Sequence, residues 1–225
     1  MEENNEQKVN TEELKSEASS TVNQVKDTIK NVNIKKDTVE AKGFIGDMFK
    51  DPLGTMQEVV NKDTNKFFKY AIIIVAVWII AEVVRRCFSL NSIYGYSHIG
   101  QSILSILITA ITPIIMILVM SLIIFVMNKN NKKSLITVLT VVTTASVPLV
   151  IASIVNILTI FSSQISMITT PFNSLCNVIS IVLMYFAAKT VFGTEKNSDF
   201  IKKFVAIEAI YYIAYFVLAF LKIYI

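Results

Sequence analysis

Residues 114–127 read IIMILVMSLIIFVM, and this stretch decides the fold because it is apolar apart from Ser121 and carries no charge. It belongs to a longer hydrophobic run over residues 99–127. Its apolar side chains do not alternate with polar ones, as they would in a strand of a membrane β-barrel. An α-helix needs about 20 residues to cross the hydrocarbon core of a bilayer. The run therefore predicts a transmembrane helix.

Four further runs extend this prediction to an all-α membrane protein, a bundle of about five transmembrane helices. They cover residues 67–88, 135–161, 171–192 and 204–225. Pro113 and Pro148 fall inside two of the five runs, and in a soluble helix each would cost about 3 kcal/mol. In a membrane bundle, neighbouring helices and Ser or Thr side chains satisfy the freed carbonyl groups. Thr144 and Ser146 stand close enough to Pro148 in the sequence for that role.

The first 66 residues differ in character from the rest of the chain. They hold 13 acidic and 10 basic residues, a net charge of −3, whereas residues 67–225 hold 4 acidic and 11 basic residues, a net charge of +7. Residues 1–42 contain no aromatic side chain and no proline, and so polar a segment buries too little apolar surface to offset its ordering entropy. We expect residues 1–42 to form a largely disordered or marginally helical cytoplasmic tail, and residues 67–225 to form the bundle.

Residues 43–66 predict an amphipathic segment at the membrane interface. Asp51 suits the N-cap of a helix and Pro52 suits its first turn, so one short helix should end and another begin there. The apolar residues on either side of this step fall on one helical face each, which is typical of helices that lie flat on a bilayer surface.

Basic residues predict the orientation of the bundle, because they concentrate in cytoplasmic loops. Ten lie on the side of the N-terminus and three on the other side. The ten are Lys62, Lys66, Lys69, Lys129, Lys132, Lys133, Lys189, Lys196, Lys202 and Lys203, and the three are Arg85, Arg86 and Lys222. The N-terminus should therefore lie in the cytoplasm and the C-terminus outside. Lysine outnumbers arginine 19 to 2, a bias typical of AT-rich genomes, so we expect a multi-pass protein of the cell membrane, the bacterial cytoplasmic membrane.

Charged side chains within or near the runs are the candidate functional groups. Glu82 and Arg86 are four residues apart and can pair on one helical face. Lys189 and Glu208 lie on consecutive runs, near the same side of the membrane, and can pair between adjacent helices. Structural ion pairs are the simpler interpretation for both sets, and a role in ion or solute movement is the alternative.

No motif predicts an enzyme. The sequence lacks H-E-x-x-H, G-x-S-x-G, a P-loop and G-x-G-x-x-G. Two cysteines, Cys87 and Cys176, are too few for a zinc ribbon. We therefore expect no catalytic residues, no cofactor and no metal site. The basic residues flank hydrophobic runs instead of forming one patch, so nucleic acid is not an expected partner either.

Two motifs resemble the Yip1 domain family. The first is FKDPLGTM at residues 49–56, with the family's Asp-Pro step at Asp51 and Pro52; the second is KKSLITVLTVVTTASVP at residues 132–148, which ends at Pro148. The resemblance covers about residues 44–222 and implies five spans with a cytoplasmic N-terminus. Eukaryotic members are tied to vesicle traffic and bind small GTPases, and some bacterial members accompany export systems.

Two functions follow as hypotheses. The first is a non-enzymatic membrane adaptor or accessory subunit, embedded in the lipid bilayer, whose cytoplasmic region binds a membrane or cytoplasmic protein. The second is a component of a transporter or export system that moves a small solute or lipid. The interior of the bundle distinguishes them. A transporter should hold a polar cavity lined by groups such as Asn156 or Glu208, and an adaptor should have a dry core.

The predicted orientation can be tested by labelling single cysteines in intact cells with a membrane-impermeant thiol reagent. We expect Gln164→Cys to be labelled and Asn131→Cys to be protected, since the positive-inside rule places them on opposite sides. Labelling at position 131 without labelling at position 164 would contradict the orientation.

Overall fold

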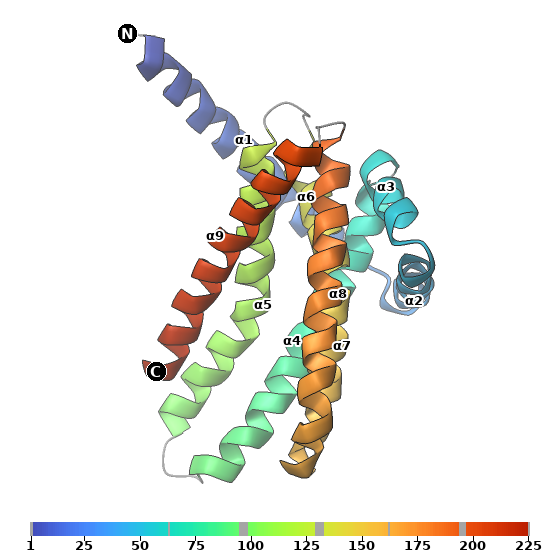
Figure 1. Cartoon of the computed structure of the whole chain (residues 1–225), viewed down its shortest axis with the longest axis vertical. Helices are drawn as coiled ribbons and strands as arrows, with labels where there is room; N and C mark the ends of the chain where they lie inside the picture. Colours follow the sequence, from blue (N-terminus) through green and yellow to red (C-terminus); the bar gives the residue numbers. More distant parts are fainter. Residues whose placement is uncertain are drawn as a thin grey trace.

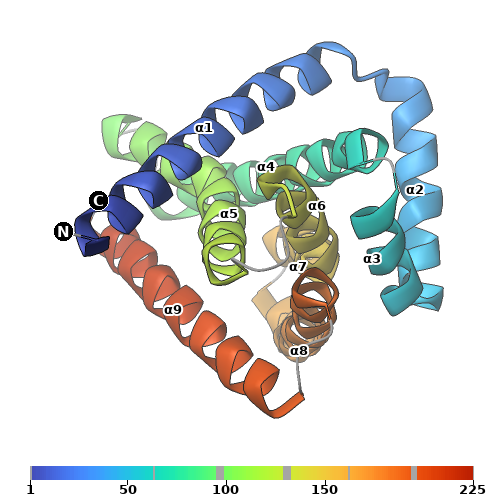
Figure 2. The same cartoon turned by 90° about the horizontal axis from the view of Figure 1, so that it is seen from above.

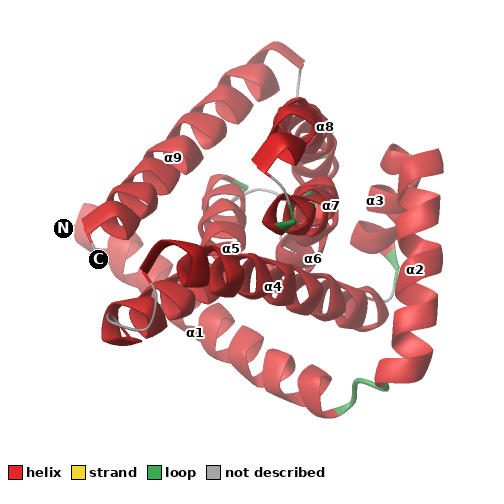
Figure 3. Ribbon diagram, turned by 90° about the horizontal axis from the view of Figure 1, so that it is seen from below, coloured by secondary structure: helices red, strands yellow, loops and turns green. Residues whose placement is uncertain are grey.

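The computed structural model describes residues 2–62, 64–94, 99–128, 133–161, 163–193 and 197–224, and within these ranges every regular element is a helix (Figures 1 and 3). The N-terminal helices are α1 (Glu2–Lys30), α2 (Ile34–Lys50) and α3 (Pro52–Asn61). The bundle helices are α4 (Thr64–Tyr94), α5 (Ile99–Met127), α6 (Leu135–Ala145), α7 (Val147–Asn156), α8 (Ser166–Phe192) and α9 (Asn197–Tyr224). Two 3₁₀ turns, η2 (Ile157–Ile160) and η3 (Ser163–Ile165), lie between α7 and α8.

Three of these helices are long and apolar enough to cross a membrane, with candidate spans at Thr64–Phe88, Ile103–Met127 and Ser166–Phe192. A fourth span results if the bent pair Leu135–Ala145 and Val147–Ile160 is counted as one. The prediction of a multi-span helical membrane protein is thus confirmed for three or four spans. The fifth predicted run coincides with α9. Three basic residues used to predict the orientation, Lys129, Lys132 and Lys196, lie outside the described residues.

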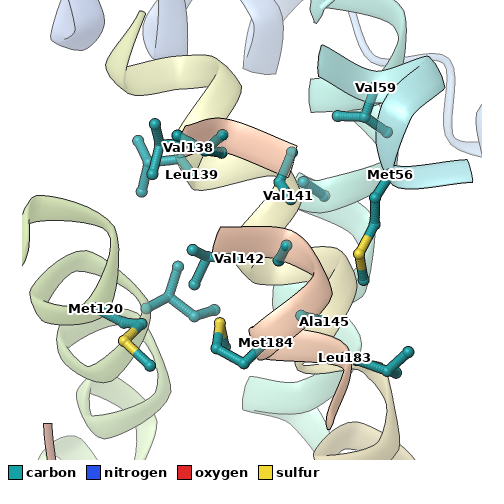
Figure 4. Packing of buried hydrophobic residues seen from close by; sticks show 14 of the residues in the cluster. Met56, Val59, Met120, Val138, Leu139, Val141, Val142, Ala145, Leu183 and Met184 are labelled. Carbon is teal, nitrogen blue, oxygen red and sulfur yellow. The ribbon is translucent and has the colours of Figure 1, made fainter. Parts of the chain in front are cut away.

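Helix α6 forms the centre of the packing, since each of its 11 residues is buried. Figure 4 shows Val138 and Val142 of α6 among side chains of the neighbouring helices, including Met120 of α5, Met184 of α8 and Met56 of α3. A helix that is buried on all sides is expected at the centre of a bundle. The other helices are therefore positioned by where they contact α6.

The third predicted run is not straight, because α6 and α7 meet at an angle of 45°. Pro148 has no backbone N–H to continue the helix, and the N–H of Leu149 bonds to the carbonyl of Ser146 at 2.9 Å. The carbonyl of Ala145 is thereby left without its helical partner. Ser180 of α8 donates its hydroxyl to that carbonyl at 3.1 Å. Thr144 and Ser146, which the sequence suggested for this role, bond instead to the carbonyls of Thr140 and Val142 in their own helix. The serine that compensates for the break comes from a neighbouring helix.

The joint between α2 and α3 is built at the Asp51-Pro52 step. Asp51 ends α2 and caps α3, accepting a hydrogen bond from the N–H of Gly54 at 2.9 Å, and Pro52 occupies the first turn. A side chain on Gly54 would collide with the Asp51 carboxylate that caps the helix. The capping prediction is confirmed. The sharp turn brings buried Phe44 and Val59 of the two helices onto the bundle.

The N-terminal tail is helical in the structure and lies across one end of the bundle (Figure 2). Glu17 of α1 accepts a hydrogen bond from the N–H of Leu135 at 3.1 Å, at the first turn of α6. Thr21 and Thr28 of α1 are buried. A second tie joins α2 to α4, where the hydroxyl of Tyr70 donates to Glu40 at 2.6 Å. These contacts fix the N-terminal helices on the side of the bundle that carries most of the basic residues.

Helices α8 and α9 meet at the loop that joins them and then diverge, as Figures 1 and 2 both show. Near the loop, Tyr185 of α8 packs its ring against Phe200 and Phe204 of α9, with centroids 5.1 and 5.3 Å apart. Farther along, α9 packs on α5. The two helices thus form a V whose closed end lies at the predicted cytoplasmic side.

Replacing Ser180 with alanine should destabilise the bundle by about 1 kcal/mol, because the carbonyl of Ala145 then loses the hydrogen bond that takes the place of its helical one. Ser174→Ala on the same helix is the matched control, since Ser174 is exposed and bonds to Thr170 of its own helix. Unfolding in detergent measures both. Equal stability of the two variants would contradict this account of the bend.

Candidate functional site

A cavity of about 490 Å³ lies inside the bundle, between α4, α5, α7, α8 and α9. Each helix contributes side chains spaced three or four residues apart, so each presents one stripe to the same space. The polar and aromatic lining residues are Trp78, Glu82, Arg85, Thr109, Thr112, Ser153, Asn156, Asn173, Asn177, Ser180, Glu208, Tyr211, Tyr212 and Tyr215. Its volume falls in the range of small-molecule sites, about 300–1,000 Å³.

One wall is a chain of hydrogen bonds between α4 and α7. The indole Nε1 of Trp78 donates to the hydroxyl of Ser153 at 3.0 Å, and that hydroxyl donates to Glu82 at 2.7 Å. Arg85 donates to the other oxygen of Glu82 at 2.8 Å. Trp78 and Ser153 are buried, where unmade hydrogen bonds are costly. The chain therefore fixes the orientation of Trp78 and of the Glu82 carboxylate.

Glu82 forms its ion pair with Arg85, which lies three residues later in the chain. The sequence had favoured Arg86, which lies four residues later. Arg86 points to α5, where its Nε donates to the hydroxyl of Ser105 at 2.8 Å. Both spacings bring side chains onto the same helical face. The sequence therefore placed this charged group correctly at the end of the span but could not select between two adjacent arginines.

The wall formed by α7 and α8 carries asparagines. The amide Nδ2 of Asn173 donates to Oδ1 of Asn156 at 2.8 Å, which is the kind of interhelical bond expected for these residues. Oδ1 of Asn173 is buried, and no donor in the described part of the chain reaches it. Asn177 follows one turn later and also lines the cavity. This wall presents both hydrogen-bond donors and acceptors to the space.

A further wall is α9, where Glu208 is followed by Tyr211, Tyr212 and Tyr215 on one face. Glu208 is half-buried, and within the described ranges no ion pair reaches it. The expected partner, Lys189, is not among the residues that line the cavity. The reason is geometric: α9 diverges from α8 after the joining loop, so Glu208 faces the cavity.

The cavity opens between α8 and α9. Three of its lining residues are exposed, Asn177 on α8 and Tyr212 and Tyr215 on α9, the two tyrosines to 43% and 50%. These two helices diverge toward the end of the V at which the opening lies. A ligand would therefore enter from the side of the bundle.

The chemistry offered by this arrangement is recognition. Hydroxyl and amide groups, one ion pair, one further carboxylate and four aromatic rings face the space. Across the residues that the structure describes, no group of three or more histidine, cysteine or acidic side chains is arranged to hold a metal ion.

Sequence reasoning named Glu82, Asn156 and Glu208 but missed Trp78, Ser153 and the tyrosines. The signal for the tyrosines was present, because Glu208-x-x-Tyr-Tyr-x-x-Tyr215 places four polar or aromatic groups on one helical face in an otherwise apolar run. Nothing in the sequence showed that this face meets a cavity.

Replacing Ser153 with alanine should change the fluorescence of Trp78, because the indole N–H loses its acceptor. Trp78 is the only tryptophan in the chain, so its emission reports on this site alone. Ser174→Ala is the control: Ser174 is exposed, lies outside the cavity lining and bonds to Thr170 of its own helix. An emission spectrum unchanged by Ser153→Ala, or shifted equally by Ser174→Ala, would contradict the hydrogen-bond chain.

Comparison with known proteins identifies the family. Neither a curated protein sequence nor a solved structure matches the chain. The model of the Yip1 domain matches residues 46–222, which includes the Asp51-Pro52 joint, the Pro148 bend and all walls of the cavity. The match covers most of the 225 residues. The chain therefore belongs to the Yip1 domain family.

Proposed function

We propose that this protein is a non-enzymatic component of a membrane transport or export system, and that it binds a small solute or lipid inside its helical bundle. The observation that carries the proposal is the polar cavity, lined by both Asn156 and Glu208. These are the two residues that the sequence singled out as marks of a transporter component. The alternative, an adaptor, requires only a dry core.

The carboxylate of Glu208 in the lining favours a binding role over a structural one. A charged side chain at the centre of a membrane helix costs about 2.5–3.5 kcal/mol by insertion measurements. The Glu82–Arg85 pair reduces that cost for two of the three charged residues in the lining, and Ser153 bonds to the same carboxylate. Glu208 has no such compensation within the described residues, and a ligand would supply it.

The proposed topology has five spans, with α9 as the fifth, the N-terminus in the cytoplasm and the C-terminus outside. The distribution of basic residues supports it. On this topology α1, α2 and α3 lie at the cytoplasmic membrane surface of a bacterial cell. Ile34 and Val39 of α2 are 76% and 73% exposed, and each leaves an apolar side chain available for contact with the membrane or with another protein of the same system.

Whether water enters the cavity can be tested with single cysteines at two adjacent positions of α8, in a chain from which Cys87 and Cys176 have been removed. Asn177 lines the cavity, whereas Val178 is 58% exposed and absent from the lining. We expect Asn177→Cys to react about tenfold faster than Val178→Cys with a small uncharged methanethiosulfonate in native membranes. The reactive species is the thiolate, which forms in water and not in lipid.

An uncharged reagent keeps this result independent of the charge that the site prefers. Slow modification at both positions would indicate a dry core and would support the adaptor function in place of the proposal.

A further inference from the structure

We propose that the cavity selects ligands in which a positively charged ammonium group is joined to an apolar chain. This inference rests on the proposed function, because it names the class of ligand for the same cavity. It is carried by three features of the lining: its charge, its aromatic rings and the position of its opening.

The charge of the lining favours a cation. Glu82 and Arg85 are 2.8 Å apart and neutralise each other. Glu208 is the remaining charged residue in the lining, and it meets no cation among the residues that the structure describes. With both carboxylates ionised the cavity therefore carries one negative charge, which attracts a cation and repels an anion at low dielectric constant.

The aromatic rings favour an ammonium group in particular. Tyr211, Tyr212 and Tyr215 follow Glu208 at three, four and seven residues, so all four side chains share one face of α9. Trp78 lines the same cavity from α4, where its N–H is already bonded to Ser153. Tryptophan and tyrosine faces attract alkylated ammonium ions through their electron density, in the manner of aromatic cages for choline-like groups.

The rest of the cavity accommodates an apolar chain. Met116 and Met120 of α5 and Met184 of α8 are buried and line it, and unbranched methionine side chains adapt to flexible chains. The opening lies between α8 and α9, beside Tyr212 and Tyr215. A ligand dissolved in the bilayer can therefore pass its head group between the two helices.

An ammonium group on an apolar chain has two natural sources. One is a membrane lipid with an ethanolamine head group, in which a phosphodiester separates the ammonium from the acyl chains, and the other is a free alkylammonium compound. The ammonium group that the cavity would recognise is common to both, so the test has an arm for each.

The test uses Trp78 as the reporter, because it lines the cavity and is the only tryptophan in the chain. The full-length protein is placed in nanodiscs of phosphatidylglycerol. Three probes are then titrated. They share the same ω-bromoundecyl chain and differ in their head group, which is trimethylammonium, glucoside or sulfate. Bromine quenches tryptophan on contact, so quenching beyond that of a tryptophan peptide in the same nanodiscs reports occupancy. For the lipid arm of the test, quenching of Trp78 is compared between phosphatidylethanolamine and phosphatidylglycerol, each with brominated chains.

We expect the trimethylammonium probe to bind about tenfold more tightly than the glucoside, and the sulfate to bind most weakly. Glu208→Gln should remove most of this preference. Asp199→Asn should preserve it, because Asp199 is an exposed carboxylate of the same helix outside the cavity. If brominated phosphatidylethanolamine quenches Trp78 more in the native protein than in Glu208→Gln, the source is the lipid. A preference limited to the free probe indicates an alkylammonium compound.

Equal affinity for the three probes would overturn the ammonium inference while leaving a ligand-binding cavity in place. Quenching no greater than in the peptide control, with every probe, would instead reject the proposed function itself. A preference retained in Glu208→Gln would also overturn the inference. If that variant does not fold, Tyr212→Leu takes its place, since removal of the ring must lower the affinity of the ammonium probe and leave that of the glucoside unchanged.

Discussion

The hydrogen bond from Ser180 to the carbonyl of Ala145 is the interaction on which the rest of the bundle depends. Away from water, each backbone polar group must be satisfied within the protein, and the break before Pro148 leaves this carbonyl without a helical donor. The serine of α8 supplies one and so joins α8 to the bend. The 45° angle then directs α7 away from the line of α6, which brings Ser153 and Asn156 to the cavity.

The bend also explains why three walls of the cavity are fixed by polar contacts. Ser153 of α7 lies between Trp78 and Glu82 of α4, and Asn156 accepts a hydrogen bond from Asn173 of α8. Helix α9 is positioned differently, by aromatic packing near its start and by contact with α5. It therefore follows α8 only near their joining loop. The cavity and its lateral opening are consequences of this difference in how the helices are held.

The sequence predicted those features that depend on local physics. Hydrophobic runs located the bundle helices, and the Asp51-Pro52 step located a helix boundary through capping alone. The cavity was not predictable, because its walls come from five helices far apart in the sequence. The position of Glu208 shows what local sequence does not predict. The short loop after Lys189 suggested that the two helices it joins form an antiparallel pair, with Lys189 beside Glu208. Instead, the packing of α9 on α5 turns Glu208 toward the cavity. The choice of Arg85 over Arg86 likewise depends on the position of Ser105 in α5.

Residue type alone does not separate structural from functional polar groups in such a bundle. Lipid tails are as apolar as leucine, so hydrophobic burial does little to hold membrane helices together, and small polar contacts take that role. Ser153, Asn156 and the Nδ2 of Asn173 form hydrogen bonds across helices, while these residues also line the cavity. Their polarity is thus explained by the fold whether or not a ligand binds. Glu208 is different, because no described cation pairs with it and its face of α9 is otherwise tyrosine. The proposed ligand would account for its presence, and the proposed function therefore depends on this residue more than on the polar residues around it.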